Sequence, residues 1–336
     1  MMMTRRVRLA FRIGYLGDYF HGSQIQPDVI TVQSELIRVM RSLNWINPED
    51  NGLLILSSRT DAGVHVRVNG GTVEIDEELW LSVGRRKFVR AIDDRLPKQL
   101  ALLDVHRVEE GWNARLALHR CYRYRLECLE GWEEPEINKF NEILECFIGT
   151  YDARNFAKME PHRNPERTIV DCKPWIVDNR IVGFEITGYA FLWNQVRRTA
   201  FAIHRTLIGE ISIQDIQKAI QEPETEVDFG VAPPEWLVLW NIEWDILPAL
   251  PLQGRDIAFS TPPAAEMVER TMMKRWRYAC GQEMKAMLQN EWAVLGILPS
   301  PYIDQRKDAE DILKSIQSED FPSKLKKTDH NNSTVN

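Results

Sequence analysis

The feature that most constrains the fold is a hydrophobic pattern that occurs twice along the chain in the same order. In the first stretch, Thr31 is placed to cap a helix, and Gly70-Gly71 marks a break before a strand. The predicted elements are a strand over 7–13, a helix over 32–43, strands over 53–56 and 72–75, a helix over 77–92 and a strand over 100–108. This β-α-β-β-α-β order is that of the ferredoxin-like unit.

The second stretch repeats this order without repeating the residues. Its predicted elements are a strand over 122–126, a helix over 137–147, strands over 168–177 and 181–187, a helix over 196–207 and a strand over 237–244. We therefore expect an α+β protein with two tandem ferredoxin-like, RRM-like halves, residues 1–110 and 111–247. Placed side by side, they would form a central, mostly antiparallel sheet with a cleft between the halves.

The chain changes character after Pro248. Apolar residues recur there at every fourth position, which predicts an amphipathic helix within an extension over residues 248–321. This helix either packs against the rest of the protein or contacts RNA or a partner through the basic residues in its middle. The polar segment 322–336 is expected to be disordered. The apolar positions are Val268, Met272, Trp276, Cys280, Met284 and Leu288.

Charge and cysteine content exclude several classes of protein. Lys and Arg number 42 against 49 Asp and Glu, a net charge of −7, which argues against a globally basic nucleic-acid binder but allows a local basic cleft. Five cysteines without a CxxC and seven histidines without an HxxxH suggest no disulfide framework and no metal site. No apolar run approaches the ~18 residues of a membrane span, so we expect a cytoplasmic protein without membrane contact. We also expect it to need no metal and no cofactor.

The segment from Ser58 to His65 is the first candidate for chemistry. Arg59 flanks Asp61 in a short turn between two predicted strands, where a guanidinium could hold the carboxylate ionised as a nucleophile or base. The alternative is an Asp-Gly-type turn in which Asp61 only caps its own backbone.

The wider sequence resembles the tRNA pseudouridine synthase A family. Ordered matches run from about residue 8 to 246, and their order and spacing are more specific than any one of them. The matching segments are 15–27 (YLGDYFHGSQIQP) with 31–33 (TVQ), 59–66 (RTDAGVHV) for the family's RTDAGVHA, 113–115 (NAR), 121–124 (CYRY), 164–169 (NPERTI), 191–197 (FLWNQVR) for the family's FLYHMVR, and 232–237 (APPEWL).

Several positions depart from the family pattern, and four of them bear on the loops that would bind RNA. Ser23 stands where the family has Trp, Ser58 where it has Gly, Asn113 where it has His, and Trp236 where it has Gly. None of these removes the family's Asp, Tyr or second Arg. They concern the shape of the loops that would bind RNA.

The resemblance implies an isomerase that converts uridine to pseudouridine after extruding the nucleotide from the RNA stack. Asp61 matches the family's required Asp, which attacks or stabilises the ribose, and a carboxylate suits positive character at C1′ without a metal. Arg197 matches the Arg that pairs with this Asp. Without the resemblance, Arg197 would read as a surface cation beside Arg198.

Further site residues follow from the same resemblance. Tyr122 matches the Tyr that stacks on the extruded uracil, and its hydroxyl is a candidate for proton transfer. Arg59 matches the residue that fills the space left by the flipped base, Leu237 would floor the uracil pocket, and His65 belongs to the same motif as Asp61. Taken alone, Tyr122 and Leu237 could equally be core residues, and Arg59 a salt-bridge partner.

A basic run on the second predicted helix is a candidate phosphate-binding patch. The run between residues 85 and 95 contains five basic and two acidic residues. Outside this context such a run would indicate a solvated helix face. The predicted substrate-binding residues are Arg85, Arg86 and Lys87. Arg90 and Arg95 belong to the same run, and Arg5, Arg6, Arg8 and Arg12 are its predicted extension.

We therefore predict a tRNA pseudouridine synthase that acts on the anticodon stem-loop at positions 38–40 and works as a homodimer. One alternative is a eukaryotic-like pseudouridine synthase with other tRNA or small-RNA targets. Another is a non-catalytic RNA-binding protein, although no RNP1-type string is present. A hydrolase using Asp61 would need a second matched carboxylate, which the motifs do not supply.

Overall fold

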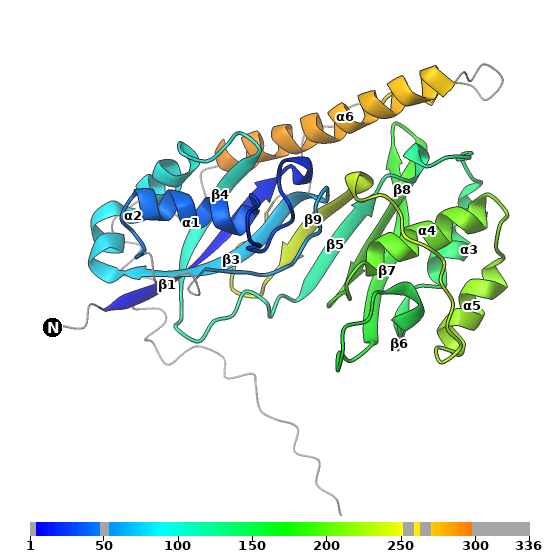
Figure 1. Cartoon of the computed structure of the whole chain (residues 1–336), viewed down its shortest axis with the longest axis horizontal. Coiled ribbons are helices and arrows are strands. Elements are labelled where there is room, and N and C mark those ends of the chain that lie inside the picture. Colours follow the sequence, from blue (N-terminus) through cyan, green and yellow to red (C-terminus); the bar gives the residue numbers. More distant parts are fainter. Residues whose placement is uncertain (1–4, 48–53, 251–258, 263–269, 298–336) are drawn as a thin grey trace, which may run out of the picture. The chain divides into compact units, whose positions relative to one another are not determined.

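One mixed sheet runs through the protein (Figure 1). The computed structural model describes residues 5–47, 54–250, 259–262 and 270–297, and residues up to Gly296 form one compact unit. The strand order is β4-β1-β3-β9-β5-β8-β7-β6, with β2 paired to β3. Every pairing is antiparallel except that of β3 with β9. The predicted α+β class and largely antiparallel sheet are confirmed.

The N-terminal part of the sheet has the strand order β4-β1-β3-β2. Thr31 caps α1 as predicted, because its hydroxyl accepts the Ser34 N–H while the Ser34 side chain accepts the Thr31 N–H. The elements are β1 (Arg6–Tyr15), a 3-10 turn (Gly17–Tyr19), α1 (Val32–Ser42), β2 (Ile55–Leu56), β3 (His65–Asp76), α2 (Glu77–Asp93) and β4 (Leu100–Val108).

The predicted break at Gly70-Gly71 is wrong, because both glycines lie inside β3. A Cβ at Gly70 would lie 2.4 Å from the Trp244 ring, and one at Gly71 would lie 2.5 Å from Phe11. Glycine is therefore needed here for close approach rather than for a turn. The break before this strand lies earlier, between the end of β2 at Leu56 and the start of β3 at His65. A separate kink occurs in α2, where Gly84 takes a φ of +68°.

The C-terminal part of the sheet has the order β9-β5-β8-β7-β6. Two of its short elements, β6 and α5, were not predicted; Ser212 and Asp215 form a capping box at the start of α5. The elements are β5 (His119–Tyr124), α3 (Ile137–Glu145), β6 (Gly149–Asp152), β7 (Glu166–Val177), β8 (Arg180–Gly188), α4 (Gln195–Leu207), α5 (Ile213–Gln221) and β9 (Leu237–Glu243), with 3-10 turns at Leu126–Cys128, Arg154–Phe156 and Pro234–Trp236.

The parallel pair β3 and β9 joins the two parts of the sheet. His65 lies opposite Val238 and Val66 opposite Leu239. Because the strands are parallel, the segments that precede them meet at the same edge. This pairing brings the turn that contains Asp61 next to the turn that contains Trp236.

Alternate residues of the sheet supply two hydrophobic cores, one on each face. On β9, Leu237 and Leu239 belong to the core shared with α1 to α5, whereas Val238 and Trp240 belong to a second core with Met284 and Leu288 of α6. The sheet is thus covered on both sides.

Helix α6 (Arg270–Ile297) covers the second face, which confirms the packing interpretation of the extension (Figure 1). Two ion pairs anchor it: the buried pair of Glu291 with Arg67 of β3 at 2.5 Å, and the pair of half-buried Glu283 with buried Arg125 at 2.9 Å. Val268, which we assigned to the same stripe, and the predicted tail at 322–336 lie outside the described residues. No helix in the described part of the chain is long and apolar enough to cross a membrane.

Candidate active site

Hydrogen bonds from β1 and the loop after it hold the turn that carries Asp61. Ser23 makes two bonds to Thr60: its N–H donates to the Thr60 carbonyl (3.1 Å) and its Oγ accepts the Thr60 N–H (2.9 Å). The Tyr15 hydroxyl lies 2.8 Å from the Thr60 Oγ1, and Gly63 donates to the Gly17 carbonyl at 3.0 Å. The turn is therefore fixed at its N-terminal side and at its end.

Gly63 gives the turn its shape. Its φ is +86°, a region that favours glycine, and a Cβ there would lie 2.9 Å from the Pro234 ring. The turn and the segment before β9 can pack closely only because residue 63 has no side chain.

Asp61 is brought together with Arg197, as predicted. The Arg197 Nη1 donates to the Asp61 Oδ2 at 3.1 Å, although 136 residues separate them. The carboxylate side chain is 34% exposed and the guanidinium 15%. Arg197 is itself held by the Ala232 carbonyl (2.8 Å) and the Asn194 Oδ1 (3.1 Å). A part-exposed carboxylate thus meets a charge that is fixed in place.

A third residue, which the sequence analysis did not single out, completes this cluster. The Trp193 indole N–H donates to the Asp61 Oδ1 at 3.1 Å. Trp193 lies inside the matched segment 191–197, two residues before α4 begins at Gln195. Its place in that segment was the available signal.

Tyr122 lies on β5, buried, with its ring edge-on to Phe191 at 5.0 Å between centroids. Burial raises its pKa from 10.0 to about 12, and the charge of Asp61 acts in the same direction, so the hydroxyl keeps its proton at neutral pH. Leu239 is its partner on β9. Leu237 is buried two residues away on the same strand, at the end nearer the Asp61 turn.

Arg59 and His65, the other predicted residues of this motif, differ in exposure and in their partners. Arg59 is exposed, with its Nη1 3.9 Å from the Glu160 Oε1. His65 is 2% exposed, and its Nδ1 accepts the Gly17 N–H at 3.1 Å. Burial lowers the pKa of His65 from 6.5 to about 4. Its observed contact is therefore with the loop under the turn.

The predicted basic patch lies on α2. The Arg85 Nη2 lies 3.5 Å from the His106 Nε2, and burial lowers the pKa of Arg85. Among the described residues, no contact joins Arg85, Arg86 or Lys87 to Asp61. The proposed extension on β1 is wrong at Arg12, which is buried and ion-paired with Asp104. An arginine neutralised inside the protein cannot also contact a phosphate.

The four departures from the family pattern have local partners here. Ser23 binds Thr60, as described. The Ser58 Oγ accepts from the Arg120 Nε at 3.0 Å, the Asn113 Oδ1 accepts from the Arg115 N–H at 3.0 Å, and the Trp236 carbonyl accepts the Arg125 N–H at 3.0 Å.

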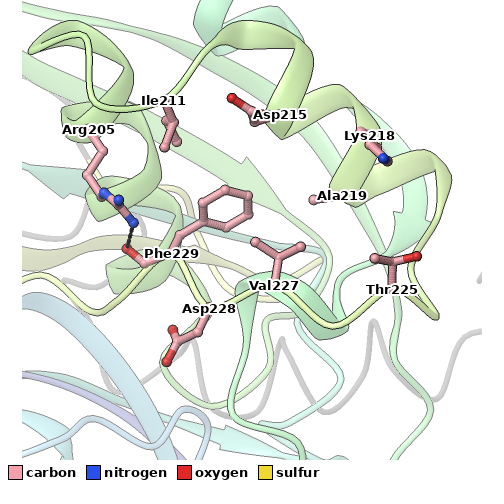
Figure 2. Close-up of a pocket in the computed structure, with 9 residues that line it drawn as sticks. All are labelled: Arg205, Ile211, Asp215, Lys218, Ala219, Thr225, Val227, Asp228 and Phe229. Carbon is pink, nitrogen blue, oxygen red and sulfur yellow. Dashed lines mark hydrogen bonds between the residues drawn. The ribbon is translucent and has the colours of Figure 1, made fainter.

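A separate pocket of about 420 Å³ lies against α4 and α5 (Figure 2). Its carboxylates are already bonded: Asp228 to Arg198 at 2.7 Å, and Asp215 to the Ser212 N–H at 2.7 Å. No described contact links it to Asp61, so it is not part of the candidate site. The lining residues are Arg205, Ile211, Asp215, Lys218, Ala219, Thr225, Val227, Asp228 and Phe229.

Within the described ranges, no three His, Cys, Asp or Glu side chains are grouped as metal ligands would be. The groups that the site offers are one ionisable carboxylate, two donors to it and a protonated tyrosine.

Comparison with known proteins gives the family of the chain. Residues 143–245 match the family model described as tRNA pseudouridine synthase. The tRNA pseudouridine synthase A of Methanosphaera stadtmanae is 32% identical over 241 residues, 70% of this chain and 84% of that protein. The proteins of the same name from Methanoculleus marisnigri and Thermococcus sibiricus are 33% and 31% identical, over 73% and 81% of this chain and 86% and 94% of their own lengths.

These matches place the chain in the class of pseudouridine synthases, isomerases that convert uridine to pseudouridine. Within that class, the chain belongs to the tRNA pseudouridine synthase family.

Proposed function

We propose that this protein isomerises uridine in the anticodon stem-loop of tRNA, at positions 38–40, with Asp61 as its one catalytic carboxylate. The observation that carries the proposal is the ion pair between Asp61 and Arg197, which is part-exposed and assembled from two distant segments. An RNA substrate agrees with the names of the relatives, all tRNA pseudouridine synthase A.

The reaction breaks the N1–C1′ bond, turns the uracil and joins its C5 to C1′. C5 loses a proton and N1 gains one, so the product is an isomer and no further reactant is consumed. Asp61 attacks or stabilises C1′ while positive character develops there. Arg197 holds the carboxylate during this exchange.

The uridine must leave the base stack before C1′ is accessible. In our proposal Arg59, which is exposed beside the turn, takes the space left by the flipped base. Tyr122 stacks on the uracil and Leu237 floors the pocket. Base–aromatic stacking contributes about 1–3 kcal/mol per base and permits the ring to rotate. For His65 we propose a supporting part, because it is buried against the Gly17 N–H.

Several further parts of the proposal rest on the sequence. They are a homodimer, a cytoplasmic location, and RNA contact through Arg85, Arg86 and Lys87. We also propose that residues 1–110 and 111–247 are tandem ferredoxin-like halves with a cleft between them. The strand orders β4-β1-β3-β2 and β9-β5-β8-β7 support this division, since each is the order expected of such a unit.

The test is to map pseudouridines in tRNA from cells lacking the gene and in tRNA transcripts treated with the purified protein. We expect pseudouridine at positions 38–40 to disappear in the first experiment and to form in the second. Pseudouridine at other tRNA positions or in small RNAs would support the eukaryotic-like alternative. Binding of tRNA without any pseudouridine would support a non-catalytic protein.

A further inference from the structure

Trp193 has an unusual position for a tryptophan at the protein surface. The residue is 44% exposed, yet its indole N–H donates to a carboxylate of another segment, Asp61, at 3.1 Å. A distance of 3.1 Å is within the normal range for an N–H···O bond, and the charge of the acceptor strengthens it.

The backbone next to Trp193 has an uncommon conformation. Asn194, the next residue, takes a left-handed conformation with a φ of +61° directly before α4. Such a conformation costs free energy in a residue other than glycine, and it persists where surrounding contacts impose it. The contacts here are the Asn194 Oδ1, which accepts from Arg197 (3.1 Å), and the Leu192 N–H, which donates to the Gln195 Oε1 (2.8 Å).

Lys158 makes two further contacts with Trp193. Its N–H donates to the Trp193 carbonyl at 2.8 Å, and its ammonium lies 4.0 Å from the centre of the indole ring. A cation over the ring is attracted by the ring electrons and restricts the indole. The Trp193 backbone is therefore held by a hydrogen bond, and its indole by a cation and Asp61.

From these contacts we infer that Trp193 is a positioning residue, which fixes the Asp61 carboxylate through its indole N–H. Arg197 binds one carboxylate oxygen and Trp193 the other, so rotation of the carboxylate about its last side-chain bond is restrained. A carboxylate has about four acceptor positions, so two donors leave room for the ribose. This inference rests on the proposed catalytic use of Asp61.

The restraint matters because an attacking group must be held close to its productive geometry. A misplacement of about 1 Å can cost about a hundredfold in rate. Loss of the indole N–H leaves Arg197 in place and frees only the second oxygen. We therefore expect a slowing of about tenfold in the chemical step, with tRNA binding changed by less than about threefold.

The experiment compares Trp193→Phe with Trp193→Tyr in the full-length protein. Both variants replace the indole by a single six-membered ring, but only Tyr, the residue of the family motif at this position, keeps a donor. Tritium release from C5-labelled uridine in tRNA is followed under single turnover with excess enzyme. Filter binding gives the Kd for the same tRNA, and thermal melts check the fold. Trp132→Phe, at a half-buried tryptophan that packs against Phe140 of α3, is the control for replacing an indole by a phenyl ring.

Slowed release in Trp193→Phe with an unchanged Kd, and recovery in Trp193→Tyr, would support the inference. Wild-type release in Trp193→Phe, or equal slowing in both variants, would overturn it. A weakened Kd with a normal rate at saturation would also overturn it, because Trp193 would then contact the RNA instead. If either variant melts early, 3-benzothienylalanine at position 193 removes the N–H and keeps the ring shape, and the same outcomes apply.

Asp61→Asn, measured in parallel, separates this inference from the proposed function. If Asp61→Asn keeps activity, the proposed role of Asp61 fails, and with it the basis for the inference. If Asp61→Asn is inactive and Trp193→Phe is normal, only the inference fails.

Discussion

Two kinds of ion pair join distant segments of this protein. At the candidate site, Asp61 meets Arg197, with the carboxylate 34% exposed. Beneath α6, Glu291 meets Arg67, with side chains 4% and 0% exposed. Both pairs combine an arginine with a carboxylate, and both link residues more than a hundred positions apart.

The difference lies in what each carboxylate can reach. Glu291 is enclosed by the sheet and α6, so its charge serves only the fold. Asp61 is restrained by protein donors but keeps an exposed side. An arginine partner therefore does not identify a catalytic carboxylate, whereas access to a substrate combined with fixed geometry does. The following predictions test this contrast between the two pairs.

Asp61→Asn should remove activity and leave stability unchanged. The amide keeps the volume of the side chain but lacks the negative charge that stabilises C1′. We expect tritium release to fall below detection while tRNA affinity changes by less than about tenfold, or ~1.4 kcal/mol.

A thermal melt of the same preparation serves as the control for folding. Release at even a few per cent of the wild-type rate, with contaminating host enzyme excluded, would falsify the assignment. A collapsed melt would instead support the interpretation of Asp61 as a residue of the turn only.

Glu291→Gln should have the opposite pattern. It leaves the Arg67 charge buried without its carboxylate, which costs about 3–5 kcal/mol of unfolding free energy in comparable cases. Urea or thermal unfolding measures this loss, and tRNA modification at low temperature should stay normal. Glu222→Gln, in the exposed pair with Lys218, is the matched control and should change stability by less than about 1 kcal/mol. Equal melts for the two variants would contradict the contrast.

Tyr122→Phe should slow the reaction without weakening binding. The ring still stacks, but the hydroxyl that could transfer a proton is gone, and general acid–base groups contribute about a hundredfold or more. Single-turnover tritium release is the measurement, and Kd for tRNA is the control. Because Tyr122→Ala would also open a cavity in a buried site, it should weaken binding and lower the melting temperature. Wild-type rates in both variants would remove Tyr122 from the mechanism.

His65 gives the smallest predicted effect, a dependence of stability on pH. Its pKa is about 4 when folded and 6.5 when unfolded, so the unfolded chain binds more protons between these values. The contribution is complete above pH 6.5 and is lost as the pH falls toward 4.

Melting temperatures measured across this range should fall toward acid in the wild type and fall less in His65→Asn, which keeps an acceptor for the Gly17 N–H. The pKa of His204 is also lowered by burial, so some slope should remain. An identical slope in the two proteins would show that His65 is not the group responsible.

Much of the fold followed from local patterns. The strand at 100–108 has the predicted bounds, and Thr31 caps α1 as predicted, because period and capping depend on residues near one another in sequence. Two short elements were missed: β6, which at four residues is too short for a clear period, and α5, although its Ser212 cap and its apolar face were present in the sequence. The glycines at 70 and 71 misled the prediction because their reason, contact with Trp244 and Phe11, lies elsewhere in the chain.

The sequence by itself determined the residue types at the site, since Asp61, Tyr122 and Arg197 stand in recognisable motifs. Only the tertiary structure decided which of them touch. The parallel pairing of β3 with β9 and the turn before α4 place Arg197 and Trp193 on Asp61, and α6 places Glu291 on Arg67. Hydrophobic period and turn chemistry act over a few residues, whereas these contacts depend on how whole elements pack.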